Sequence, residues 1–210
     1  NVSVRLAGDL PSVQKSFFRN LVAAFFAAII LIKNHTAPKV EKTQWGSLFL
    51  RCAFGTLGIL CNFYAIDHLL VADASILNKL SPFFAIIFSF LLLKERIKPA
   101  QAMCVILAFV GCLFVVKPGF ENAHLIPALI GVCGGLGAGI AYTMVRKMGT
   151  HGVKGPVIVF YFSCFSCIIV IPWIVFHYQP MSLRQLLTLL LAGLFAAGGQ
   201  FTITAAYTYA

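Results

Sequence analysis

Charged residues are scarce in this 210-residue chain, and acidic residues are the scarcest of all. Aspartate and glutamate together number 6, charged residues make up 10% of the chain, and hydrophobic residues make up 60%. A soluble globular domain needs far more charge than this on its surface, so the composition indicates a membrane protein. The six acids are also dispersed along the sequence, so no pair of carboxylates is placed for acid–base catalysis.

The sequence also lacks the short motifs of ATP-driven pumps and of hydrolases. It contains no P-loop, no HExxH and no GxSxG. Its seven cysteines lie inside apolar segments, and the CxxC formed by Cys164 and Cys167 has no second ligand pair and no βαβ context. We therefore expect reduced cysteines that serve in packing, no metal site, no cofactor and no enzymatic activity.

Long apolar runs dominate what is present. The hydrocarbon core of a bilayer is about 30 Å thick, so a helical crossing needs roughly 20 apolar residues. Strand edges cannot stay unpaired in lipid, which makes helices the expected form. The sequence therefore predicts an all-α fold, a polytopic membrane helical bundle, with crossings at residues 17–32, 45–66, 71–93, 100–116, 125–144, 156–176 and 183–210.

The net charge of +10 comes mostly from short connections between these segments. Nine basic residues lie in the connections 33–44, 94–98 and 146–154, whereas five lie at the opposite ends of the segments. Connections rich in lysine and arginine usually face the cytoplasm. The charge thus predicts the orientation of a multi-pass protein of the inner (plasma) membrane, and it does not indicate a nucleic-acid partner.

Two stretches of the chain resemble each other at an offset of 141 residues. Residues 48–69 can be laid over residues 189–210, which puts Phe54 over Phe195 and Gly58 over Gly199. Chance similarity between apolar segments is the alternative explanation. A duplication predicts a first repeat at 1–117, containing helices two to five, and a second at 118–210, containing helices six to eight. Helix one and helices nine and ten are then absent from this stretch.

An odd number of helices in each repeat has a topological consequence. Two five-helix units must cross the membrane in opposite directions, which predicts an inverted five-plus-five repeat. Proteins with this symmetry bind substrate where the two halves meet and open alternately to each side.

A polar stripe follows the 71–93 segment. Ser75, Asn78, Lys79 and Pro82 are spaced i, i+3, i+4, i+7 and share one face of a continuous helix. Pro82 removes the hydrogen bond to the Asn78 carbonyl, so we expect a kink there. Ionisable groups at membrane depth usually face the bundle interior, where Lys79 is a candidate for binding a carboxylate or phosphate. Pairing with a structural acid, or reaching the membrane interface, are the alternatives for Lys79.

The 45–66 segment carries a second stripe, formed by Arg51, Gly55, Gly58 and Asn62. Arg51 lies near the predicted cytoplasmic end and is expected to reach the interface. Asn62 lies deeper and is a candidate for a cavity wall, although hydrogen bonding between helices is equally compatible with its position. Asp67, at the following turn with Asp73, is expected to be solvated at a helix end, and relay of a proton by either carboxylate is the alternative.

The second repeat offers corresponding residues. Gly131, Gly135 and Gly139 follow a GxxxGxxxG spacing that lets another helix approach closely, and Tyr142 continues their face. A sliding surface for alternating access is the functional reading of the same glycines. Gln200, Thr204 and Tyr207 form the stripe that corresponds to that of Asn62. The candidate substrate-binding residues are therefore Asn62, Ser75, Asn78, Lys79, Tyr142, Gln200, Thr204 and Tyr207.

The stretch FYAIDHLLVADASILNKLSPFFAIIFSFLLLKERIK at 63–98 resembles the EamA-like transporters of the drug/metabolite transporter superfamily. The resemblance implies ten helices in two inverted units and transport of small metabolites, often amino acids or related compounds, commonly outward. Lys79 departs from the apolar residue usual in the family. The residues that carry the resemblance are Arg19, Ala65, Ile66, Ala72, Ala74, Pro82 and Glu95.

These observations together predict a secondary-active exporter of small metabolites that works by alternating access. Its expected partners are a small-molecule substrate and membrane lipid, with a proton as candidate coupling ion and a homodimer as candidate assembly. An intramembrane lipid-processing enzyme and a non-transporting membrane scaffold are the alternative classes. The first would need clustered acids or histidines, and the second has no need of inverted symmetry.

Overall fold

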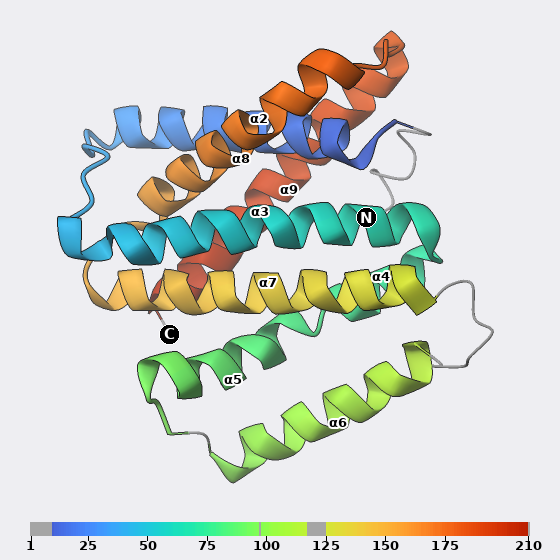
Figure 1. The fold of residues 1–210 in the computed structure, drawn as a ribbon. Helices are drawn as coiled ribbons and strands as arrows, with labels where there is room; N and C mark the ends of the chain where they lie inside the picture. The colour runs from blue at the N-terminus through green and yellow to red at the C-terminus, as the bar shows by residue number, and fades with distance from the viewer. Residues whose placement is uncertain (1–9, 97, 117–124, 210) are drawn as a thin grey trace.

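The computed structural model describes residues 10–96, 98–116 and 125–209. Within these ranges every regular element is a helix (Figure 1). Six segments are long and apolar enough to cross a membrane, and Pro99–Val116 forms a further apolar helix. The predicted all-α polytopic bundle is thus confirmed. The elements are α2 (Ser12–Lys33), η1 (Lys42–Gln44), α3 (Trp45–His68), α4 (Val71–Asn78), α5 (Ser81–Leu93), α6 (Pro99–Val116), α7 (Leu125–Thr150), α8 (Gly155–His177) and α9 (Leu183–Tyr209).

The 71–93 segment differs from the single kinked helix expected for it. It is split into α4 and α5, because α4 ends at Asn78 and α5 begins at Ser81. The Leu80 amide bonds to the Leu77 carbonyl at 3.2 Å, which closes α4 with a tighter turn. Pro82 occupies the first turn of α5, where its missing N–H would have no helical partner anyway. Proline therefore starts a new helix here instead of bending an existing one.

Helices α3 and α7 run antiparallel and lie side by side (Figure 1). Glycines on both helices bring the two backbones together. A Cβ atom added at Gly58 would lie 3.0 Å from the Gly134 carbonyl oxygen, and one added at Gly137 would lie 2.9 Å from the Phe54 carbonyl oxygen. Because the opposing atoms belong to the backbone, no rotamer change can make room. Close packing of this kind is a main source of helix association in lipid.

The predicted GxxxGxxxG face of α7 turns towards α4 and α5. A Cβ atom added at Gly135 would lie 2.9 Å from the Leu77 carbonyl oxygen, and one added at Gly139 would overlap Phe84. A Cβ atom added at Gly131 would lie 2.9 Å from the Leu77 Cδ1 atom. The expected close approach of a neighbouring helix is confirmed. The glycines of α7 in fact serve two faces, one for α3 and one for α4 and α5.

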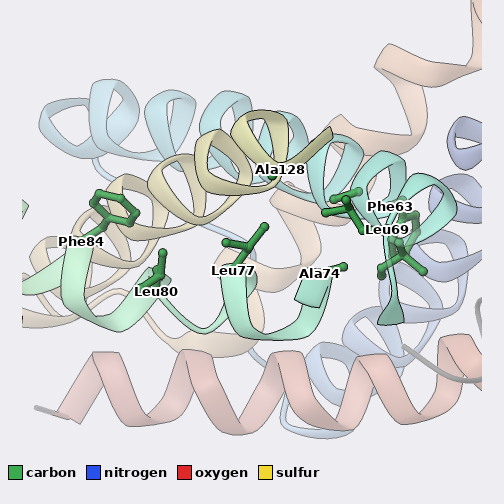
Figure 2. Close-up of a cluster of buried hydrophobic side chains, with 9 residues drawn as sticks. Phe63, Leu69, Ala74, Leu77, Leu80, Phe84 and Ala128 are labelled. Atoms are coloured by element: carbon green, nitrogen blue, oxygen red, sulfur yellow. The ribbon is translucent and has the colours of Figure 1, made fainter. Parts of the chain in front are cut away.

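An apolar cluster fastens the broken α4–α5 segment to α3 and α7 (Figure 2). In Figure 2 the side chains of Leu77 and Leu80, on either side of the break, lie along the same row as Ala74 and Phe84. The break therefore does not detach α4 or α5 from the bundle. The cluster consists of Phe63, Ala65, Ile66, Leu69, Ala74, Leu77, Leu80, Phe84 and Ala128.

Hydrogen bonds between helices complete the packing. The Thr56 and Ser166 hydroxyl oxygens lie 2.5 Å apart and join α3 to α8, and both residues are buried. The Gln14 side chain exchanges two hydrogen bonds with the backbone of Gln179, at 3.0 and 3.1 Å, and so ties the start of α2 to the connection between α8 and α9. Such contacts contribute about 0.6 kcal/mol each on average inside a membrane, and up to about 1.7 kcal/mol.

Candidate functional site: a polar cavity between the helices

A cavity of about 350 Å³ lies between α2, α3, α4, α7, α8 and α9. This volume falls in the range of small-molecule pockets, about 300–1,000 Å³. Its walls combine apolar side chains, among them Ile59 and Leu189, with amides and cationic groups. A hollow of mixed polarity inside an apolar helical bundle is suited to binding a small polar solute.

Four of the eight predicted binding residues line this cavity: Asn62, Asn78, Tyr142 and Gln200. They come from four different helices, α3, α4, α7 and α9. Helical spacing, and for Gln200 also the apparent repeat, predicted an inward face for each of them, and the fold brings the four faces together. The amide and phenol groups can donate and accept hydrogen bonds, so the wall can hold neutral polar groups of a ligand.

Thr204 and Tyr207 lie behind this wall and support it. The Gln200 Nε2 donates a hydrogen bond to the Thr204 Oγ1 at 3.2 Å, and Thr204 is buried. The Tyr207 ring stacks on the Tyr142 ring with centroids 4.9 Å apart and an interplanar angle of 9°. These two residues are placed to orient the groups that line the cavity, although they do not line it themselves.

Lys79 and Ser75 do not line the cavity, contrary to the inward stripe that we expected. Lys79 is exposed and is the first residue beyond α4. The Ser75 hydroxyl donates a hydrogen bond to the Val71 carbonyl oxygen at 2.6 Å, within its own helix. The i, i+7 spacing assumed one continuous helix, and α4 ends before that spacing is complete. Asn78 alone of this stripe reaches the cavity.

Arg51 does not lie where its place near the predicted cytoplasmic end of α3 suggested. Its side chain does not reach the interface, because the residue is 1% exposed and lines the cavity. The guanidinium carbon lies 3.9 Å from the centroid of the Phe162 ring, in a cation–π contact. Its Nε has no hydrogen-bonding partner among the described residues. The signal for an inward position was Gly55, four residues later on the same face of α3.

Gly55 makes the room that the Arg51 side chain occupies. A Cβ atom added there would overlap the Arg51 Nη1 and would lie 2.8 Å from the Phe162 Cε2. The guanidinium is thus held between a glycine backbone and an aromatic ring, which fixes where its charge lies.

Lys15, a second cationic residue of the cavity wall, is matched by an acid. Its Nζ lies 2.8 Å from the Asp67 Oδ1, and its side chain is 2% exposed. The Ser12 hydroxyl donates a further hydrogen bond to the Asp67 Oδ2 at 2.5 Å. Asp67 was expected to be solvated at a helix end. Asp67 is indeed exposed at the end of α3, and in addition it joins this end to the start of α2.

Arg19 is the third cationic residue in the wall. Its Nη1 donates a hydrogen bond to the Asn20 Oδ1 at 3.2 Å, which leaves its charge uncompensated. Among the described residues that line the cavity, none is an aspartate or a glutamate. The cavity therefore carries two guanidinium charges, those of Arg19 and Arg51, without a carboxylate in its wall.

The described part of the chain contains no group of three or more histidine, cysteine, aspartate or glutamate residues that could hold a metal ion. The arrangement of groups around the cavity is one of hydrogen-bonding amides, aromatic rings and fixed cations. Such a set can bind and orient a solute.

This architecture defines a multi-pass helical membrane protein with a solute-sized cavity inside the bundle. Residues 2–117 match the EamA-like transporter family. The chain belongs to this family. It is 32% identical over 207 residues to the pseudopaline exporter CntI of Pseudomonas aeruginosa, a match that covers 97% of this chain and 71% of the relative.

More distant relatives are also transporters by name. The riboflavin transporter of Brucella anthropi is 26% identical over 157 residues, which cover 73% of this chain and 54% of the relative. Human solute carrier family 35 member G1 is 26% identical over 218 residues, which cover 97% of this chain and 60% of the relative. The resemblance found in the sequence is thus confirmed, and the relatives indicate a membrane transporter rather than an enzyme.

The fold is shared with a protein of known crystal structure. The two superpose with a TM-score of 0.75, over 99% of this chain and 74% of the other, at 14% sequence identity. At this identity the likeness establishes the fold alone.

Proposed function

We propose that the chain is the substrate-binding part of a secondary-active transporter that exports small metabolites. The observation that carries the proposal is the cavity of about 350 Å³, into which polar residues from four helices converge. Its walls come from both predicted repeats: α2, α3 and α4 belong to residues 1–117, and α7, α8 and α9 belong to residues 118–210. A site between two halves is where an alternating-access transporter binds its substrate.

The residues of the wall have distinct tasks in this proposal. Asn62, Asn78 and Gln200 offer amides to polar groups of the substrate, and Tyr142 offers a phenol. Thr204 and Tyr207 keep Gln200 and Tyr142 in place through the hydrogen bond and ring stacking described above. Rocking of the inverted repeats would expose the cavity first to one side of the membrane and then to the other.

The glycine faces of α7 and the break between α4 and α5 are suited to this motion. A helix that packs through glycine presents no protruding side chains, so a neighbour can slide along it. The break lets α4 move with the cavity wall, since Asn78 is its last residue, while α5 keeps its own direction.

The orientation proposed for the membrane follows from the basic connections. The connections between α2 and α3, α5 and α6, and α7 and α8 all lie at the same end of the bundle (Figure 1). Two contacts link them, since Lys154 Nζ donates to Thr36 Oγ1 at 3.3 Å and Arg146 pairs with Glu95 at 3.1 Å. We assign this end to the cytoplasm by the positive-inside rule and the protein to the inner membrane.

Flux in proteoliposomes tests the proposal. The full-length protein is reconstituted, and uptake or release of a panel of small metabolites is measured with and without a proton gradient. Gln200→Ala should reduce transport of the active solutes several-fold, because Gln200 is buried in the cavity wall. Thr202→Ala, an exposed position on the same helix, should leave transport unchanged. Absence of flux for every solute and gradient, from protein shown to be folded, would refute the proposal and favour a scaffold.

A further inference from the structure

We propose that the substrate is a small organic anion whose carboxylate or phosphate group binds to the guanidinium of Arg51 in the cavity. This inference rests on the proposed function, because it takes the cavity as the site of transport. It names the class of substrate, which the fold and the relatives leave open.

The Arg51 guanidinium is buried in the cavity wall and held in a fixed position there. The residue is 1% exposed, and its guanidinium sits against the Phe162 ring and lies over the Gly55 backbone. No described residue accepts a hydrogen bond from its Nε. An ionised group buried without a partner is strongly destabilising, so a buried guanidinium usually faces an anion. The fork of N–H donors on arginine also matches the paired oxygens of a carboxylate or phosphate.

The charges of the cavity wall as a whole also favour an anion. Lys15 is neutralised by Asp67, whereas Arg19 and Arg51 line the cavity with no acidic residue in its described wall. Two like charges in a low-dielectric cavity repel each other, and an anion bound between the walls relieves that repulsion. A cationic substrate would add a third positive charge, which makes the cavity selective against cations.

The rest of the wall limits the body of the substrate. Ile59, Leu189 and Phe195 contribute apolar surface, and Asn62 and Gln200 contribute amides. A volume of about 350 Å³ admits a small metabolite and excludes a peptide or a whole lipid. The anionic group of the substrate is thus assigned to Arg51, and a compact, partly apolar remainder to the rest of the cavity wall.

Charge-selective labelling tests the cavity without requiring transport. Gly199 lines the cavity, and a Cβ atom added there meets no atom within 4 Å, so Gly199→Cys introduces a thiol that fits. The full-length protein in phosphatidylcholine nanodiscs is treated with methanethiosulfonates of similar size, one sulfonated and one bearing a trimethylammonium group. Labelling of this site is measured by peptide mass spectrometry, which separates it from the native cysteines. Gly46→Cys, an exposed position on α3, is the reference site.

The measured quantity is the labelling rate of the anionic reagent divided by that of the cationic reagent. At Gly199→Cys this ratio should be about ten, after normalisation to the ratio at the reference site. Arg51→Gln should lower this ratio by about fivefold, and Arg51→Lys, which keeps the charge, should retain most of it. A normalised ratio near one, or one that Arg51→Gln leaves unchanged, would overturn the inference.

Competition in the flux assay then separates this inference from the proposed function. Glutarate and glycerol 3-phosphate should inhibit flux of an active solute, whereas glutaramide and 1,5-diaminopentane, which are neutral and cationic, should not. Arg51→Gln should abolish the difference. Flux that only the cationic compound inhibits overturns the anion inference and leaves the transporter standing. Absence of any flux refutes the transporter, while the labelling ratio still reports the charge of the cavity.

A lipid headgroup could supply the same phosphate chemistry, so the labelling is repeated with phosphatidylglycerol in the nanodiscs. Protection of Gly199→Cys by glutarate in pure phosphatidylcholine supports a soluble anion. If Gly199→Cys is protected only when phosphatidylglycerol is present, and glutarate does not change its labelling, the site binds lipid and the inference is overturned.

Discussion

Replacing Gly55 by alanine should impair substrate binding while leaving the protein folded. The new Cβ atom would overlap the Arg51 Nη1 and lie 2.8 Å from the Phe162 Cε2. Both clashing groups are ends of side chains, so the guanidinium and the ring can shift without moving the backbone of α3. The substitution therefore displaces the Arg51 charge from its position and keeps its sign.

The expected change in stability is small because two effects oppose each other. Alanine is favoured over glycine within a helix by about 1 kcal/mol. Displacing the guanidinium weakens its contact with Phe162, which is worth about 0.5–2 kcal/mol. The free energy of unfolding should therefore change by no more than about 1 kcal/mol.

The expected change in substrate affinity is much larger. A hydrogen bond to a charged group contributes about 1.5–3 kcal/mol. Since 1.4 kcal/mol is a factor of ten in an equilibrium constant, losing it should raise the half-saturating substrate concentration by about ten- to a hundredfold. Gly46→Ala, on the same helix with no atom within 4 Å of its added Cβ, should leave this concentration unchanged.

Two measurements on each variant check the reasoning: thermal unfolding in nanodiscs and the concentration dependence of flux in proteoliposomes. A Gly55→Ala protein with normal unfolding and normal half-saturation would show that the position of Arg51 does not matter to binding. A large loss of stability would show instead that the Arg51 guanidinium and the Phe162 ring cannot shift to make room for the new Cβ atom.

Three further predictions concern packing and charge. Gly137→Ala places a Cβ atom 2.9 Å from a backbone oxygen and should lower the free energy of unfolding by about 1–3 kcal/mol. Gly198→Ala, which meets nothing within 4 Å, should be neutral or stabilising, and equal unfolding temperatures for the two would contradict the packing argument. Asp67→Asn leaves the buried Lys15 ammonium unpaired and should destabilise by about 3 kcal/mol. Lys15→Gln should lower the free energy of unfolding by less than Asp67→Asn does, because the Asp67 side chain that it leaves unpaired is 24% exposed. A larger destabilisation by Lys15→Gln than by Asp67→Asn in denaturation experiments would refute this account. Lys79→Ala should change flux less than about twofold and stability by no more than about 0.5 kcal/mol, because the side chain is exposed and outside the cavity; a loss of transport would return it to the site.

The helices were predictable because one physical requirement dominates in lipid. A run of apolar residues must satisfy its own backbone, so length and composition suffice to locate the crossings. The break at Asn78 was only half predictable. A proline indicates that the helix is interrupted near its position. Whether the helix bends or a new helix starts depends on how the two parts pack, here through Leu77 and Leu80.

The residues of the cavity wall also differ in how well their positions could be predicted from the sequence. Asn62 and Gln200 could be placed because helical spacing and the apparent repeat fix which face is inward. Arg51 could not be placed, because its side chain is long enough to point either way and its position depends on Phe162, 111 residues further along the chain. The pairing of Lys15 with Asp67 likewise depends on how α2 and α3 meet. Contacts between distant residues, unlike periodicity, leave no trace in local sequence.

The two glycine faces of α7 bear on how such a protein can acquire new substrates over evolutionary time. A methyl group added at any glycine of these faces meets backbone or packed side-chain atoms, so these positions of α7 have little freedom to mutate. The wall formed by α9 is different, since Gly199 has open space around it. Selection for a different solute should therefore act first on α9, while α7 stays fixed as the constant part of the fold.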